Sequence, residues 1–244
     1  NSQAAYRLAE VQYKILSDLD AALYLYEQTY QHANSKNLLI DAGVGIINIL
    51  IGKGDLDLAK KKCMKLIKEN PNIFTFKIKY SQILFYQGSF NEASKELKDL
   101  TQNLEINDPN FNDILEVLSI MSIFNENQSE FTTFSKAQHN LQQNKRIGAL
   151  KNLESILNSD KEIIADMCKY QSAWLYYLQG DLSNSKKQLN SIKNNTIYKE
   201  LSHIFNAEIL DYIENDISKA IDNYLKFLDL YPQSIYYDDI RLRL

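Results

Sequence analysis

Apolar residues recur at every third or fourth position along most of this 244-residue chain, and that spacing is typical of amphipathic helices that bury one face. Short breaks rich in Gly, Asp, Asn and Pro separate the periodic stretches. The pattern predicts helices over residues 4–15, 21–32, 39–51, 59–69, 73–86, 91–104, 111–124, 130–143, 148–157, 161–178, 182–192, 197–213, 218–230 and 235–244. With only 7 glycines and 3 prolines, the chain has too few turn residues for a β-sandwich or a β-barrel. We therefore expect an all-α protein.

One sequence motif repeats at a fixed spacing. It opens with Gly54 and Asp55, continues through a helix that carries Ala59, and stops before Pro71. Thirty-four residues after Gly54, a second turn glycine, Gly88, begins the motif again. A period of this size indicates stacked helical hairpins, each of which completes its core against its neighbours.

Small residues mark the second helix of the predicted hairpins, where two helices cross too closely for a large side chain. These positions are Ala22, Ala59, Ala93, Ala149, Ser185 and Ala220. They lie 34 to 37 residues apart, except for one step of 56 between Ala93 and Ala149. We expect about seven hairpins, with an irregularity at residues 105–130 and a partial or capping helix at residues 233–244.

These residues resemble the tetratricopeptide repeat (TPR) family, in a degenerate form. Twelve residues separate Ala59 from Pro71, and twelve separate Ala220 from Pro232, as in the second helix of a TPR hairpin. Ser185 departs from the pattern, because alanine is usual there. The resemblance covers nearly the whole chain. It implies a single repeat domain over residues 1–244, built as a right-handed superhelical solenoid of antiparallel helix–turn–helix hairpins.

The closing segment resembles the last repeat of bacterial cell-envelope proteins of this family, in which a Tyr-Pro-x-Ser-x-Tyr phrase is followed by an arginine. Those places are held here by Tyr231, Pro232, Ser234, Tyr236 and Arg241. This resemblance implies a periplasmic or outer-membrane-associated location, and it leaves a cytoplasmic one open.

The net charge argues against one class of partner, the longest apolar run is too short for a membrane span, and the cysteines are expected to be buried. The formal net charge is -4, whereas a nucleic-acid surface carries a basic stripe, so we expect no nucleic-acid partner. The longest apolar run, at residues 38–51, contains Asp41 and Asn48 and is shorter than the roughly 20 residues of a membrane span. Cys63 and Cys168 fall on apolar helix faces, which predicts buried thiols.

No recognisable motif for catalysis or for a cofactor occurs in the sequence. His32, His139 and His203 stand outside any metal-binding spacing, and the Gly43-x-Gly45 pair lies inside an apolar helix. We therefore expect no enzyme activity, no metal and no cofactor. The lysine run at residues 60–62 is interpreted as a solvated helix face, with an anion or partner patch as the alternative.

Aromatic residues supply the candidate binding surface. In a hairpin array the first helices line a concave groove, and Tyr170, Trp174 and Tyr177 share one face of such a helix at spacings of i, i+4 and i+7. Exposed aromatic residues are typical anchors of protein interfaces. The alternative is that a register error of one residue places Trp174 in the core. The candidate partner-binding residues are Phe85, Phe134, Gln138, Tyr170, Trp174 and Tyr177.

The function that these features favour is a non-catalytic scaffold that binds a protein or peptide segment in the groove. The resemblance to envelope proteins adds a role as an assembly or adaptor factor. Two alternatives stay open: an RNA-binding helical repeat, and the non-catalytic repeat domain of a larger enzyme. The terminal helix offers a surface for docking a second copy of the chain.

Overall fold

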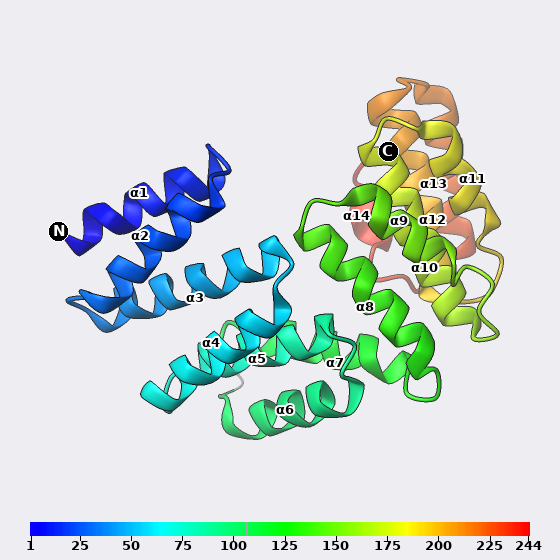
Figure 1. Cartoon of the computed structure of the whole chain (residues 1–244). Coiled ribbons are helices and arrows are strands. Elements are labelled where there is room, and N and C mark those ends of the chain that lie inside the picture. Colours follow the sequence, from blue (N-terminus) through cyan, green and yellow to red (C-terminus); the bar gives the residue numbers. More distant parts are fainter. Residues whose placement is uncertain (106) are drawn as a thin grey trace. The chain divides into compact units, whose positions relative to one another are not determined.

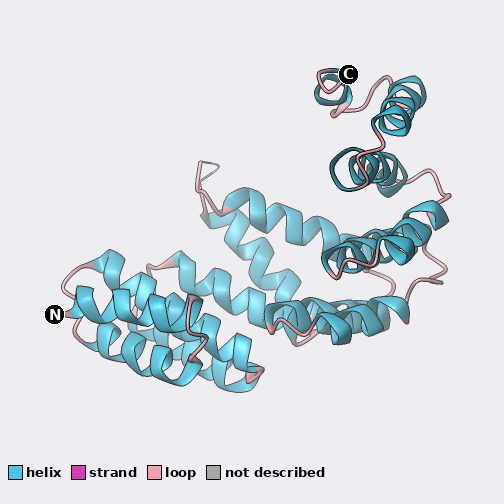
Figure 2. Ribbon diagram, turned by 90° about the horizontal axis from the view of Figure 1, so that it is seen from above, coloured by secondary structure: helices cyan, strands magenta, loops and turns pink. Residues whose placement is uncertain are grey.

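The structure is a computed structural model that describes residues 1–105 and 107–244. Over these residues the fold is all-α, and no strand is present (Figure 2). Residue 106, inside the stretch where an irregularity is expected, lies outside the described residues. None of the helices in the described ranges combines the length and the apolar character that crossing a membrane requires.

The helices follow one another with short connections, and their bounds agree closely with the predicted ranges (Figure 1). The elements are α1 (Ser2–Lys14), α2 (Leu19–Gln31), α3 (Lys36–Lys53), α4 (Leu56–Glu69), α5 (Phe74–Tyr86), α6 (Phe90–Asn103), α7 (Phe111–Ile123), α8 (Gln128–Gln142), α9 (Arg146–Glu154), α10 (Glu162–Leu178), α11 (Leu182–Ser191), α12 (Ile197–Glu208), the π-helical segment η1 (Ile209–Ile213), α13 (Ile217–Leu230) and α14 (Tyr237–Arg241). The chain divides into two compact units, Asn1–Ala149 and Leu150–Leu244, and each is described by itself. The expectation of one repeat domain stays a prediction.

A left-handed residue followed by a capping residue builds the hairpin turns. The residues with positive φ in the described ranges are Ser17, Gly54, Gly88, Asn144, Gly180 and Asn215. In four of these turns the next residue is an aspartate that accepts a hydrogen bond from a backbone N–H in the first turn of the second helix, namely Asp18, Asp55, Asp181 and Asp216. The left-handed residue reverses the chain, and the carboxylate satisfies a donor that the helix itself leaves unpaired.

The predicted small-residue positions lie where the helices of the hairpins cross. All six are buried, with at most 2% of the residue exposed: Ala22, Ala59, Ala93, Ala149, Ser185 and Ala220. Neighbouring helices pack in succession from α1 to α6 and from α10 to α13. The expected TPR-like, all-α array of hairpins is thereby confirmed.

The lysine run on α4 links successive second helices of unit 1. Lys60 pairs with Glu92 on α6 at 3.2 Å, and Lys62 pairs with Glu27 on α2 at 2.6 Å. These two lysine side chains are only 27% and 28% exposed, so the run is not a uniformly solvated face. Lys60 and Lys62 thus bridge the second helices of successive hairpins, while Lys61 between them is exposed.

The long step of 56 residues contains one additional helix, α7, which precedes α8. In α8, Phe131 packs edge-on against Phe85 of α5, with ring centroids 5.3 Å apart. Further along, the His139 ring stacks on Tyr86 at 5.6 Å, and its Nε2 atom lies 3.0 Å from the Ile51 carbonyl oxygen at the end of α3. Burial lowers the pKa of His139. Helix α8 therefore packs against α5 and α3, and α7 is inserted before it as an additional helix.

A close contact in unit 1 gives a test of the packing of α3. A Cβ atom on Gly45 would lie 2.7 Å from the ring of Tyr26, which is 1% exposed and donates its hydroxyl to Glu10. We expect Gly45→Ala to lower the free energy of unfolding by about 1–3 kcal/mol, because overpacking displaces a buried ring. Gly52→Ala on the same helix meets no atom within 4 Å, and we expect it to be neutral or stabilising by up to about 1 kcal/mol. Urea unfolding of the two variants checks this pair; equal effects would contradict the packing.

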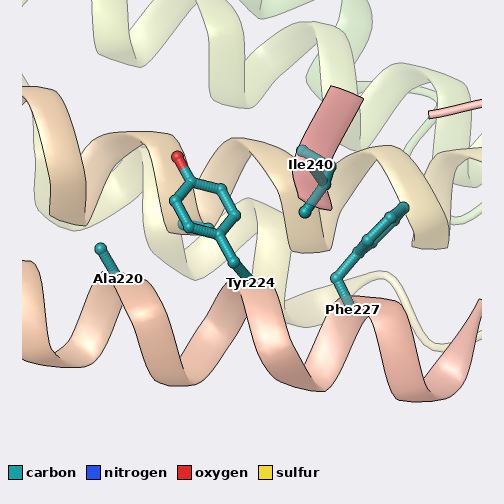
Figure 3. Close-up of a cluster of buried hydrophobic side chains, with 5 residues drawn as sticks. Ala220, Tyr224, Phe227 and Ile240 are labelled. Carbon is teal, nitrogen blue, oxygen red and sulfur yellow. The ribbon is translucent and has the colours of Figure 1, made fainter. Parts of the chain in front are cut away.

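In unit 2, α13 and α14 close a small apolar cluster. Ala220, Tyr224 and Phe227 project from one side of α13 toward Ile240 of α14 (Figure 3). Ile240 is 2% exposed, so the short helix α14 is docked by this side chain. The terminal helix is shorter than the range expected at residues 235–244.

Candidate functional site

Helix α10 carries Tyr170, Trp174 and Tyr177, the aromatic residues that the helical spacing predicts to share one face. It begins at Glu162 and ends at Leu178, just before the left-handed Gly180. Its buried side includes Cys168, Ala173 and Leu175, which hold the helix against its neighbours. At the edge of that side, Tyr170 and Tyr177 are half-buried and Trp174 is 47% exposed. The alternative that places Trp174 in the core is therefore wrong.

Phe205 of α12 is the centre of this cluster, and sequence analysis did not select it. It is 4% exposed, and its ring centroid lies 5.3 Å from Trp174, 5.4 Å from Tyr177 and 6.0 Å from Tyr170. The Trp174 and Tyr177 rings also stack on each other at 5.4 Å, with an interplanar angle of 26°. We name Tyr170, Trp174 and Tyr177, together with Phe205 beneath them, the α10 aromatic surface.

The geometry of the α10 aromatic surface suits the binding of a ligand. The contacts with Phe205 and Tyr177 hold the Trp174 indole in one orientation and still leave about half of it in solvent. An aromatic side chain that is already held loses little conformational entropy on binding. Its exposed area contributes apolar burial and stacking to an interface. The surface therefore presents to solvent an aromatic ring that already packs against its neighbours.

An ion pair joins Glu208, at the end of α12, to Arg243, which follows α14. Arg243 Nη1 is 2.7 Å from Glu208 Oε1, and the guanidinium lies over the rings of Tyr212 and Tyr224, at 5.7 Å and 5.9 Å. Burial and then the charge of Glu208 raise the pKa of Tyr170. Tyr212 is 60% exposed. Charged and aromatic groups from η1, α13 and the residues after α14 thus gather at the end of α12.

The three candidate residues in unit 1 have different surroundings. Phe134 is fully buried and Phe85 is 8% exposed, and their ring centroids lie 6.4 Å apart. Phe134 also packs against Phe124 at 5.0 Å. Gln138 is half-buried on α8. The expectation that Phe85 and Phe134 face a groove is corrected, because these rings join α8 to α5.

The cysteines and histidines do not assemble a reactive site. Within the described ranges, no three His, Cys, Asp or Glu residues lie close enough together to hold a metal ion. Cys63 and Cys168 are buried and form no disulfide; their burial is as predicted. The Cys63 thiol lies 3.1 Å from the Phe76 carbonyl oxygen, and burial raises its pKa to about 12. A thiol with so high a pKa is inert as a nucleophile at neutral pH.

The fold and the surface define a class: an all-α protein of TPR-like helical hairpins with an exposed aromatic face. The sequence matches no family model and no curated protein. One solved structure similar to it comes from a study titled "Functional Characterization of Pseudomonas Aeruginosa pilF". The TM-score is 0.37 and the identity 14%, over 100% of this chain and 97% of that one. A likeness at this level identifies neither a family nor a function, and the class rests on the helices themselves.

Proposed function

We propose that this chain is a non-catalytic scaffold that binds a protein or peptide segment on the α10 aromatic surface. The observation that carries the proposal is Trp174, which is 47% exposed while its ring is held by Phe205 and Tyr177. Tryptophan and tyrosine are enriched among the residues that dominate binding energy at protein interfaces. Arrays of helical hairpins typically present extended surfaces of this kind to their partners.

The chemistry of the surface suggests the kind of segment that binds. An apolar, aromatic or proline side chain would stack on the exposed face of Trp174, which adds apolar burial. The Glu208–Arg243 pair offers both a carboxylate and a guanidinium to a polar neighbour in the bound segment. Because this pair is one-third exposed, it contributes more to selectivity than to affinity.

A location at the bacterial envelope, with a role in assembly or as an adaptor, belongs to the proposal. It is supported by the likeness of the closing segment, with Tyr231, Pro232, Ser234, Tyr236 and Arg241, to the last repeat of envelope TPR proteins. Fractionation of the cells that make the protein tests this part, since recovery with the cytoplasmic fraction alone would contradict it.

Peptide selection tests the binding surface. Peptides from a random displayed library are selected on the wild-type chain, after depletion on a Trp174→Ala variant. For the selected peptides we expect Trp174→Ala to weaken binding by about 30-fold or more, the effect of losing an interface hot spot of about 2 kcal/mol. The matched control is Tyr24→Ala, which removes an aromatic residue of 62% exposure from α2 and should change affinity by less than about twofold.

Two results would contradict the proposal. One is a selection that yields no peptide that discriminates wild type from Trp174→Ala. The other is equal loss of affinity in Trp174→Ala and Tyr24→Ala. Thermal unfolding of both variants serves as the control for folding, because a half-exposed side chain contributes little to the core.

A further inference from the structure

Lysines from three helices and one connection of unit 2 converge on a single pocket. Lys186 of α11, Lys199 of α12 and Lys226 of α13 line it, together with Lys193 from the connection between α11 and α12. His203 of α12 belongs to the same lining. The pocket has a volume of about 380 Å³, which falls in the range of small-molecule sites.

The charge balance of this pocket differs from that of the chain. The whole chain carries a formal net charge of -4, yet no acidic residue is among those that line the pocket in the described structure. Lys186 pairs with Glu214. Lys193, Lys199 and Lys226 form no ion pair with any residue of the described ranges. Lys193, Lys199 and Lys226 therefore line one pocket without an ion-pair partner in the described residues, and their positive charges repel one another.

The imidazole of His203 lies close enough to the pocket lysines for their positive charges to affect it. The ring is half-buried and packs edge-on against Tyr231, with centroids 5.5 Å apart. Burial, followed by the charges of Lys226, Lys199 and Lys193, lowers the pKa of His203. At neutral pH the imidazole is therefore uncharged, and it can donate one N–H to a ligand.

We infer that this lysine pocket binds a small anion that carries phosphate groups. Several amines from separate elements can each donate to a different phosphate oxygen, and such charge-assisted hydrogen bonds are stronger than neutral ones. A multivalent anion also relieves the repulsion among the lysines. The hollow shape favours a small ligand over a flat membrane surface.

The lysine pocket is separate from the α10 aromatic surface. Lys199, His203 and Asn206 reach it at helical spacings of i, i+4 and i+7, and they lie on a different face of α12 from Phe205. A failure of peptide binding at Trp174 would therefore leave the anion site untouched, and the reverse also holds. Trp174→Ala serves as the variant that separates the two proposals.

The test uses the full chain with inorganic pyrophosphate as the probe. Calorimetry measures the binding of pyrophosphate, and NMR measures the titration of His203. We expect pyrophosphate to bind and to raise the pKa of His203, because a bound anion offsets the field of the lysines. The double variant K199Q/K226Q should weaken binding at least tenfold, since each charge-assisted hydrogen bond contributes about that factor. The matched control K187Q, an exposed lysine of α11 outside the pocket, should change affinity less than about twofold.

Absence of pyrophosphate binding, or an unchanged titration of His203, would overturn the inference. Equal weakening of binding by K199Q/K226Q and by K187Q would also overturn it, because it would indicate a general attraction to positive charge. Tighter binding of a hexaglutamate peptide than of pyrophosphate would assign the pocket to acidic peptides instead. Retention of pyrophosphate binding by Trp174→Ala supports a separate site. Circular dichroism of K199Q/K226Q confirms that the variant is folded, which these exposed and half-exposed lysines lead us to expect.

Discussion

Phe134→Ala is expected to lower the free energy of unfolding by about 3–5 kcal/mol, the usual cost of truncating a buried phenylalanine. The side chain is fully buried, and its ring lies 5.0 Å from Phe124 and 6.4 Å from Phe85 between centroids. Phe131 joins the same cluster through Phe85 and Phe124. Truncation removes these aromatic contacts and leaves a cavity where α8 meets α5.

Urea unfolding followed by circular dichroism measures this loss. Gln138→Ala is the matched control, because Gln138 is half-buried one turn further along α8, and its truncation should cost less than about 1 kcal/mol. Both residues are candidates for partner binding from sequence alone, so the comparison separates a core role from a surface role. A Phe134→Ala variant as stable as Gln138→Ala would show that α8 does not pack through this ring.

Asp166→Ala is expected to cost about 3 kcal/mol, the lower end of the range for breaking a buried ion pair. Asp166 is fully buried in α10, and its carboxylate accepts hydrogen bonds from Lys169 Nζ at 3.2 Å, Thr196 Oγ1 at 3.0 Å and Asn194 Nδ2 at 3.3 Å. The variant leaves three polar groups without their acceptor. The lower end applies because the Lys169 side chain is 17% exposed and keeps some hydration.

The matched control for Asp166→Ala is Asp238→Ala. Asp238 pairs with Arg241 at a similar distance of 3.2 Å, but its side chain is 76% exposed, so its loss should cost less than about 1 kcal/mol. Asp166 also ties the connection before α12 to α10, and α12 supplies Phe205 beneath Trp174. We therefore expect Asp166→Ala to change the emission of Trp174 as well as the midpoint of unfolding. Equal midpoints for the two aspartate variants would contradict the buried network.

Features encoded within a few residues of the chain could be predicted from the sequence. The turn at Gly54 and Asp55 is an example, because the left-handed residue and the capping carboxylate are adjacent. The buried small residues of the hairpins, such as Ala59 and Ala220, follow from the same repeat. The shared face of Tyr170, Trp174 and Tyr177 follows from helical spacing on α10, whereas the exposure of Trp174 is shown only by the structure.

Features that depend on long-range packing could not be predicted. Phe134 lies in the core although its spacing is that of a groove residue, because its ring packs against Phe85 of α5 and against Phe124, which follows α7. The acceptors and donors around Asp166 lie up to 30 residues away in the sequence. The lysines of the pocket come from four segments of the chain, so no run of lysines in the sequence indicates it. In the lysine run on α4, two members form ion pairs with other helices.

Trp174 is the only tryptophan in the chain, so its fluorescence reports directly on the α10 aromatic surface. The decisive measurement is quenching of this fluorescence by acrylamide, with and without a selected peptide. The proposed scaffold role predicts an accessible indole in the free chain, and a blue-shifted, protected indole when the peptide is bound. A peptide that binds while the quenching and emission of Trp174 stay unchanged would show that binding occurs elsewhere and would contradict the proposed surface.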